Sequence, residues 1–197
     1  MYPEIIIATH NQHKLVEIKN IFGTGFNLLS LNAVNYNQPI PEPYHTLEEN
    51  AFIKAQTIFQ EFKKPCFSED TGLFIEALNG EPGVFSARYA GIQATAEQNI
   101  QKVMQLMVVE DNRKAYFKTV VCLIIDESPI YFEGRMDGNI NQQLSGENGF
   151  GYDAIFIPHN AHKTFAQMEL AEKNKYSHRM IAINKLKNHL IQFYEKT

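Results

Sequence analysis

The chain has 197 residues, with 18 Lys and Arg against 22 Asp and Glu, so its formal net charge is −4. Its hydrophobic fraction of 44% and charged fraction of 20% are those of an ordinary globular protein, which excludes disordered and collagen-like classes. The acidic balance disfavours a binder of duplex nucleic acid, because such proteins displace phosphate counterions with an excess of Lys and Arg.

The sequence gives little sign of a membrane-spanning segment, a disulfide or a zinc site. The longest apolar run, residues 120–125, falls far short of the ~18 residues that span a bilayer, and no charged leader precedes the first apolar run. We therefore expect a cytoplasmic protein without a membrane partner. Cys66 and Cys122 each lie alone in an apolar segment, which favours buried thiols over a zinc site or a disulfide.

The first third of the chain predicts strand, helix, loop and helix. Residues 4–8 are a short β-branched run typical of a buried strand, and apolar residues at helical spacing follow in 15–22. Three prolines within 39–43 exclude helix and predict an extended loop over 32–45. Thr46 and Glu49 have the spacing of a capping box, which predicts a helix over residues 47–62.

The rest of the chain alternates strands and helices. Residues 65–68 predict a strand that leads into Glu69, and residues 79–83 are rich in turn formers. Thr95 and Gln98 repeat the capping-box spacing and predict a third helix reaching Met107. Residues 115–125 and 130–136, joined by a turn at 126–129, predict an antiparallel hairpin. A strand over 154–157, a short helix beginning at Thr164 and a C-terminal helix complete a mixed α/β or α+β chain in one piece.

Polar residues follow the first predicted strand directly, at the start of a helix. A helix N-terminus offers backbone N–H groups and a positive dipole, and Thr9, Asn11 and Lys14 add a hydroxyl, an amide and a cation. This composition suits a phosphate group, although the glycines of a Walker loop are missing. The alternative is an ordinary Asn or Thr cap beside a solvated Lys.

Carboxylates come next at the end of the strand over 65–68. Glu69 and Asp70 are neighbours, so one is expected to face a cleft while the other turns into a supporting network. Glu42, in the proline-rich loop, can add an oxygen, and Mg²⁺ needs only one or two carboxylates when phosphates and water fill its other positions. The alternative is a simple Asp-Thr-Gly turn.

Two further clusters suit a nucleobase. The two glycines of Asn148-Gly-Phe-Gly-Tyr-Asp153 permit close backbone approach, and Phe150 offers a flat face for stacking, unless the segment is only a hairpin turn. Three hydrogen-bond donors near the last helix could read a base carbonyl: Lys173, His178 and Arg179. The alternative is that they are ordinary surface residues. Together the four clusters describe a nucleotide site with metal-assisted phosphoryl chemistry.

The same residues resemble the inosine triphosphate pyrophosphatase family, which hydrolyses non-standard purine nucleoside triphosphates. The resemblance runs from Ile5 to about Leu186. It is carried by ATHNQHK at 8–14, Glu42 with TLEENAFIKA at 46–55, SEDTGL at 68–73, EPGVFSARYAG at 81–91, NGFGYDAIF at 148–156 and EKNKYSHR at 172–179.

The resemblance implies a mixed α/β fold, with a long twisted mixed sheet flanked by helices and two lobes that enclose the active-site cleft. It implies a single catalytic domain over residues 1–197, usually in a homodimer. The implied activity is Mg²⁺-dependent hydrolysis of dITP, ITP and XTP to the monophosphate and pyrophosphate. Purine nucleoside triphosphates are then the partners, and nucleic acid is not.

Site roles follow by motif position. Asp70 takes the place of the metal-binding general base, with Glu42 and Glu69 as further metal candidates. The resemblance implies that the loop 8–14 and Lys54 bind the triphosphate and that Thr71 contacts the substrate. The residues implied in substrate binding are Thr9, His10, Asn11, Gln12, His13, Lys14, Lys54, Thr71, Phe150, Gly151, Tyr152, Asp153, Lys173, His178 and Arg179.

Some positions depart from the common family pattern. Glu69 stands where many members have Asp, which leaves its direct contact with the metal open, and Ala154 replaces a frequent proline. His10 and His13 stand where glycine is frequent, and could tighten or crowd the phosphate loop.

Two functions of other classes stay open at this point. A regulatory purine-nucleotide-binding protein would use the same cradle and stacking residue without hydrolysis. A binder of single-stranded RNA would use Phe150 as its platform, but the net charge of −4 and the lack of a basic track disfavour it.

Overall fold

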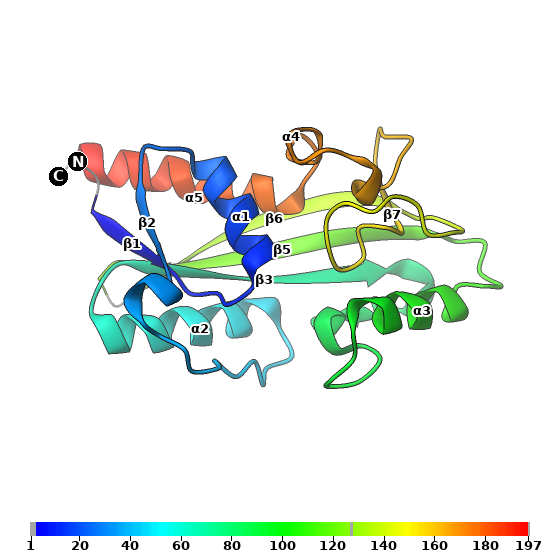
Figure 1. The fold of residues 1–197 in the computed structure, drawn as a ribbon, viewed down its shortest axis with the longest axis horizontal. Helices are drawn as coiled ribbons and strands as arrows, with labels where there is room; N and C mark the ends of the chain where they lie inside the picture. The colour runs from blue at the N-terminus through cyan, green and yellow to red at the C-terminus, as the bar shows by residue number, and fades with distance from the viewer. Residues whose placement is uncertain (1–2, 127, 197) are drawn as a thin grey trace. The chain divides into compact units, whose positions relative to one another are not determined.

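The computed structural model describes residues 3–126 and 128–196. Figure 1 shows its helices and strands along the chain. The strands are β1 (Glu4–Ile7), β2 (Asn27–Ser30), β3 (Cys66–Ile75), β4 (Pro82–Gly83), β5 (Lys114–Ile124), β6 (Pro129–Ile140) and β7 (Phe156–Pro158). The α-helices are α1 (Gln12–Phe22), α2 (Leu47–Phe62), α3 (Ala96–Leu106), α4 (Leu170–Lys173) and α5 (His178–Glu195). Short 3-10 helices are η1 (Asn32–Val34), η2 (Glu76–Leu78), η3 (Ser86–Arg88) and η4 (Phe165–Gln167).

The strands form a mixed sheet in the order β2-β1-β3-β5-β6-β7, with β4 paired to β3. β1 is parallel to both β2 and β3, whereas β4 is antiparallel to β3 and β7 is antiparallel to β6. The predicted mixed α/β class is therefore confirmed. None of the helices in the described residues combines the length and apolar character needed to cross a bilayer.

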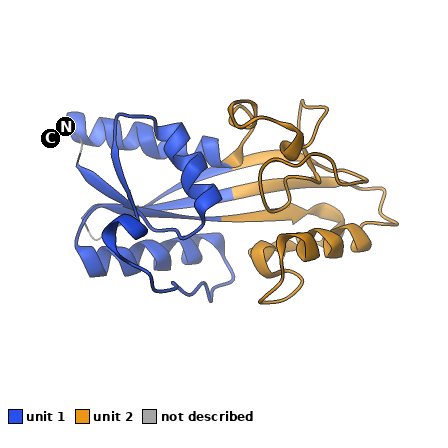
Figure 2. Ribbon diagram, viewed as in Figure 1, with its two compact units in different colours: residues 1–70, 119–134, 179–197 blue, residues 71–118, 135–178 orange. Residues whose placement is uncertain are grey.

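The chain forms two compact units, which are coloured separately in Figure 2. Unit 1 comprises Met1–Asp70, Thr119–Gly134 and Arg179–Thr197, and unit 2 comprises Thr71–Lys118 and Arg135–His178. β3, β5 and β6 each contribute residues to both units. Each unit has its own cluster of buried apolar side chains.

In unit 1, helices cover both faces of the strands (Figure 1). α1 and α5 pack in one core cluster with β1, Phe67 of β3 and Val121 of β5. On the other face, Ser68 Oγ donates to the Ala51 carbonyl of α2, and Cys66 Sγ donates to that of Ala55 at 3.2 Å. Odd and even positions of β3 therefore face opposite helices, as strand geometry requires.

Most of the elements predicted from local signals are confirmed. α2 has the predicted bounds, and the Thr46 side chain caps it by accepting from Glu49 N at 3.2 Å. α3 begins after a complete capping box, in which Thr95 and Gln98 bond each other's backbone N–H groups. Both cysteines are buried free thiols, as expected, and burial raises the pKa of each to about 12. The turn predicted at 126–129 includes residue 127, which lies outside the described residues.

Three strand predictions need correction. The strand over 65–68 was predicted to end before Glu69, but β3 continues to Ile75, so Glu69 and Asp70 lie inside a strand. Asp and, less strongly, Glu are depleted in strands, and here buried ion partners compensate the charge of both residues. The short edge strands β2 and β4 were not predicted, because they depend on pairing with β1 and β3. β7 begins at Phe156, two residues later than predicted.

Candidate active site

The predicted phosphate loop lies between β1 and α1. Asn11 is the N-cap of α1, and its Oδ1 accepts from Lys14 N at 3.1 Å, while Thr9 Oγ1 accepts from Asn11 N at 3.2 Å. Gln12 and His13 are exposed at the first turn. The cap that the sequence offered as an alternative is thus present, and it orders the helix end at which an anion would bind.

His10 ties this loop to the proline-rich loop. Its Nε2 lies 2.9 Å from the Gln38 carbonyl oxygen, and its ring stacks on Tyr36 with centroids 6.3 Å apart. The side chain is exposed and points toward 36–38. His10 therefore links the two loops.

Glu42 and Asp70 meet at one ammonium group in unit 1. Lys54 Nζ on α2 donates to Asp70 Oδ1 on β3 at 3.1 Å and to Glu42 Oε1. Burial lowers the pKa of Lys54, but the attraction of Asp70 and Glu42 outweighs it and the net shift is upward. Lys54 is therefore a fixed positive charge at neutral pH.

Asp70 combines burial with incomplete charge compensation. Burial raises the pKa of its carboxyl group, and the attraction of Lys54 and Lys14 opposes this rise only in part. A carboxylate with a raised pKa is a stronger proton acceptor than an ordinary Asp, which suits a general base.

Glu69 faces the other side of β3 and enters a buried ion-pair network. Arg179 Nε lies 2.9 Å from each Glu69 oxygen, and Arg179 Nη1 donates to Glu17. Lys14 Nζ lies 3.3 Å from Glu69 Oε1. Burial raises the pKa of Glu69, yet Arg179 and Lys14 lower it to about 2. The network joins α1, β3 and α5.

This network differs from two sequence predictions. Arg179 was expected to read a base carbonyl, but the residue is only 1% exposed and its guanidinium is bonded to Glu69 and Glu17. Glu69 was expected beside a metal ion, but Arg179 and Lys14 engage its oxygens instead. The physical reason is charge compensation, since a buried carboxylate or guanidinium needs an opposite partner.

Acidic side chains outnumber cationic ones in the two charged clusters just described. Across the two clusters described above, four carboxylates meet three cationic side chains: Glu17, Glu42, Glu69 and Asp70 against Lys14, Lys54 and Arg179. Within the described ranges, no group of three or more His, Cys, Asp or Glu side chains is arranged as a metal centre. Glu42 and Asp70 nevertheless converge on a single point, and two carboxylates suffice for Mg²⁺ when phosphates complete the shell.

In unit 2, Asp153 organises the segment that carries Phe150. Its Oδ2 accepts from Phe150 N at 2.8 Å and from Lys173 Nζ at 2.7 Å. Lys173 Nζ also lies 5.0 Å from the centroid of the Phe150 ring. A Cβ on Gly149 would come within 2.1 Å of Asp153 Oδ2, and its φ of +77° also requires glycine. Three predicted base-pocket residues are thus brought together.

The other predicted site residues of unit 2 differ from one another in burial and in their contacts. Tyr152 is buried and donates to the Ser86 carbonyl oxygen at 2.9 Å. His178 is 3% exposed, with its ring stacked on Phe117 at 4.6 Å between centroids. Gly151 has a left-handed φ of +59° with nothing within 4 Å of its Cβ position, and Thr71 is half-buried on β3. Tyr152 and His178 therefore carry packing roles besides any contact with substrate.

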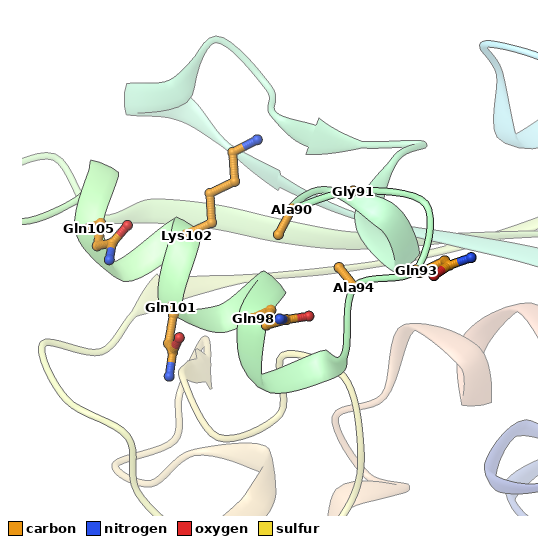
Figure 3. Close-up of a pocket in the computed structure, with 8 residues that line it drawn as sticks. All are labelled: Ala90, Gly91, Gln93, Ala94, Gln98, Gln101, Lys102 and Gln105. Carbon is orange, nitrogen blue, oxygen red and sulfur yellow. The ribbon is translucent and has the colours of Figure 1, made fainter.

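A hollow elsewhere in unit 2 contains none of the predicted residues. It measures about 620 Å³ and lies between α3 and residues 90–94. Figure 3 shows its glutamine-rich wall, to which Gln98, Gln101 and Gln105 contribute. This hollow lacks the carboxylates and phosphate-binding groups of the clusters around Asp70 and Lys14. We therefore place the candidate site at the clusters and not at the hollow.

Two important residues were missed in the sequence. Glu17 pairs with Arg179, and its signal was a charged residue among the buried positions of α1, three residues after Lys14. Asn50 is completely buried near the start of α2, where an exposed polar residue would be ordinary. In both cases the signal was a polar side chain on a face that turned out to be buried.

Comparisons with known proteins cover nearly the whole chain. A protein of Thermoanaerobacter pseudethanolicus named dITP/XTP pyrophosphatase is 44% identical over 196 residues, which are 98% of this chain and 99% of that relative. One of Christiangramia forsetii with the same name is 43% identical, over 95% of this chain and 98% of the relative. The solved structure of the Staphylococcus aureus Ham1 protein matches with a TM-score of 0.87 and 37% identity, covering 96% of this chain and 99% of that one. Residues 5–189 match the model of the Ham1 family, and the chain belongs to that family.

Proposed function

We propose that this protein is a Mg²⁺-dependent nucleoside-triphosphate pyrophosphatase that hydrolyses dITP, ITP and XTP to the monophosphate and pyrophosphate. The names of its relatives support the reaction class. The observation that carries the proposal is the meeting of Asp70, Glu42 and Lys54, close to the phosphate-type loop on α1 in the same unit.

The donor set fits a magnesium ion. Glu42 and Asp70 both reach Lys54 Nζ, so their oxygens already converge, and oxygen is the ligand that Mg²⁺ prefers. When bound there, the ion would offset negative charge on the phosphate oxygens during the reaction.

The chain's own groups supply the remaining chemistry. Asp70 takes a proton from the water that attacks the α-phosphorus, while the bond from that phosphorus to the bridging oxygen breaks and pyrophosphate leaves. Lys54 remains protonated and stabilises the charge of the departing oxygens, and Lys14 adds a second ammonium group. Arg179 acts indirectly: it binds the Glu69 carboxylate, and that carboxylate in turn binds the Lys14 ammonium group.

Unit 2 supplies groups suited to a purine. The Phe150 ring offers a stacking face, while Asp153 accepts from its backbone N–H and Lys173 Nζ lies over the ring, 5.0 Å from its centroid. With Arg179 engaged elsewhere, discrimination of a keto group from an amino group passes to the donors of this unit, Lys173 and His178. A site built for such a bond rejects the wrong partner because a buried polar group is left unpaired.

We also propose an oligomeric state, a cellular compartment and a class of partner for the enzyme. It acts as a homodimer in the cytoplasm on free nucleotides, rather than on nucleic acid. The acidic net charge of −4 supports free nucleotides, and the family resemblance supports the dimer.

Pyrophosphate release from dITP, ITP and XTP with Mg²⁺ tests the substrate class, with dGTP and ATP as comparison substrates. We expect rapid release from the first three and at least 100-fold lower kcat/KM for ATP. Equal activity on all five would overturn the proposed specificity, and no activity on any of them would favour a non-catalytic nucleotide-binding protein.

A further inference from the structure

The loop that carries Glu42 has little means of holding itself in place. Pro39, Pro41 and Pro43 have no N–H group, so this stretch cannot form a continuous hydrogen-bonded ladder. Side chains outside the loop contribute to its order. One of these is His10, which contacts Gln38 four residues before Glu42.

Another of these contacts is a clamp by Asn50. The Asn50 Oδ1 accepts from Tyr44 N at 3.0 Å, and its Nδ2 donates to Tyr44 O at 3.2 Å. A single side-chain amide thus satisfies both backbone groups of the residue two places after Glu42. Asn50 is completely buried, so its amide group is not hydrated by bulk water.

The position of Asn50 on α2 connects the clamp to the site. Asn50 and Lys54 are four residues apart and so lie on the same side of the helix, one turn from each other. The helix therefore holds the loop with one residue and meets the Glu42 carboxylate with the other. Asp70 completes the arrangement from β3.

We propose that Asn50 is a positioning residue that presents the Glu42 carboxylate toward Asp70 for cation binding, by clamping the backbone of Tyr44. The inference rests on the proposed function, because it assigns a purpose to the Glu42–Asp70 pair. Asparagine suits the task because its amide carries one donor and one acceptor at this reach, whereas Asp lacks the donor and Leu lacks both.

A matched control exists in unit 2. Asn99 on α3 is 4% exposed, and its amide accepts from Ala90 N at 2.8 Å and donates to Ala87 O at 3.1 Å. Its removal costs a similar pair of buried hydrogen bonds but touches neither Glu42 nor Asp70. Asn99→Leu therefore reports the effect of a lost amide clamp on stability alone.

The test measures Mn²⁺ binding to the full chain without nucleotide, by loss of the free Mn²⁺ signal in electron paramagnetic resonance. We expect Asn50→Leu to raise the Mn²⁺ Kd about 10-fold, as other residues that orient metal ligands do, and Asn99→Leu to leave it within about twofold. Thermal unfolding checks that both variants fold. If Asn50→Leu does not fold, Asn50→Ala replaces it, because the smaller side chain leaves room for water at Tyr44.

A double-mutant cycle decides whether the effect passes through Glu42. If it does, Asn50→Leu adds nothing to the loss of Mn²⁺ affinity caused by Glu42→Gln. Additive losses, or an Asn50 variant that binds Mn²⁺ like the wild type, would overturn the inference. Failure of the wild type to bind Mn²⁺ would also overturn it, whereas failure of the wild type to release pyrophosphate would contradict the proposed function.

Discussion

Neighbouring residues of one strand carry different chemistry in this protein. Glu69 and Asp70 project to opposite faces of β3, so Glu69 meets Arg179 and Lys14 while Asp70 meets Lys54. The pKa of Glu69 is lowered and that of Asp70 is raised, although both are buried. The difference lies in the number and closeness of the cations that each carboxylate meets.

Arg179 should contribute more to stability than to chemistry. Arg179→Met leaves Glu17 and Glu69 buried without their guanidinium, and breaking such a pair costs about 3 kcal/mol. Lys64→Met, which removes the exposed pair with Glu4, should cost about 0–1 kcal/mol. Urea unfolding of both variants measures the difference, and equal losses would show that the network does not stabilise the fold.

Glu69 also predicts how stability depends on acid. Its folded pKa of about 2 lies below the ordinary 4.5, so its stabilising contribution is complete above pH 4.5 and is lost as the pH falls toward 2. Urea midpoints of the wild type and Glu69→Gln should therefore differ most at pH 6 and approach each other at pH 2. A gap between the two that is independent of pH would contradict the assignment.

Single elements of this fold serve several parts of the site. α2 contributes the Asn50 clamp and the Lys54 ammonium group, and β3 contributes both acids and then pairs with β4. At that pairing, a Cβ on Gly72 would lie 2.5 Å from the Gly83 carbonyl oxygen. The end of β3 therefore depends on a close backbone approach that only glycine permits.

The matched glycines Gly72 and Gly25 test this approach. Gly72→Ala should lower the free energy of unfolding by about 1–3 kcal/mol, because the backbone of β4 must move. Gly25→Ala, whose Cβ would have no atom within 4 Å, should change it by less than about 0.5 kcal/mol. Chemical denaturation compares the two, and a neutral Gly72→Ala would contradict the described register.

Local signals predicted the elements whose causes are local. α2 and α3 could be predicted because caps and apolar spacing lie within each helix. The full length of β3 could not, because its acids are accommodated by cations from α1, α2 and α5. The site followed the same rule: the residue types were evident, but the pairing of Arg179 with Glu69, 110 residues away, depends on the fold.

At the scale of the whole molecule, net charge and site charge differ. The chain carries −4, yet the predicted phosphate-binding groups include Lys14 and Lys54. Each is paired with a carboxylate in unit 1, so the cations are in place before any substrate binds. An acidic protein can therefore bind a polyanion through a local arrangement of charge.

The central claim is that Asp70 serves as the base of a pyrophosphatase. The most direct measurement is pyrophosphate release from dITP with Mg²⁺, by the wild type and by Asp70→Asn, with circular dichroism to confirm that both are folded. We predict release by the wild type and a loss of more than ~100-fold in the variant, as expected when a general base is removed. Equal release by the two proteins, or none by the wild type, would contradict it.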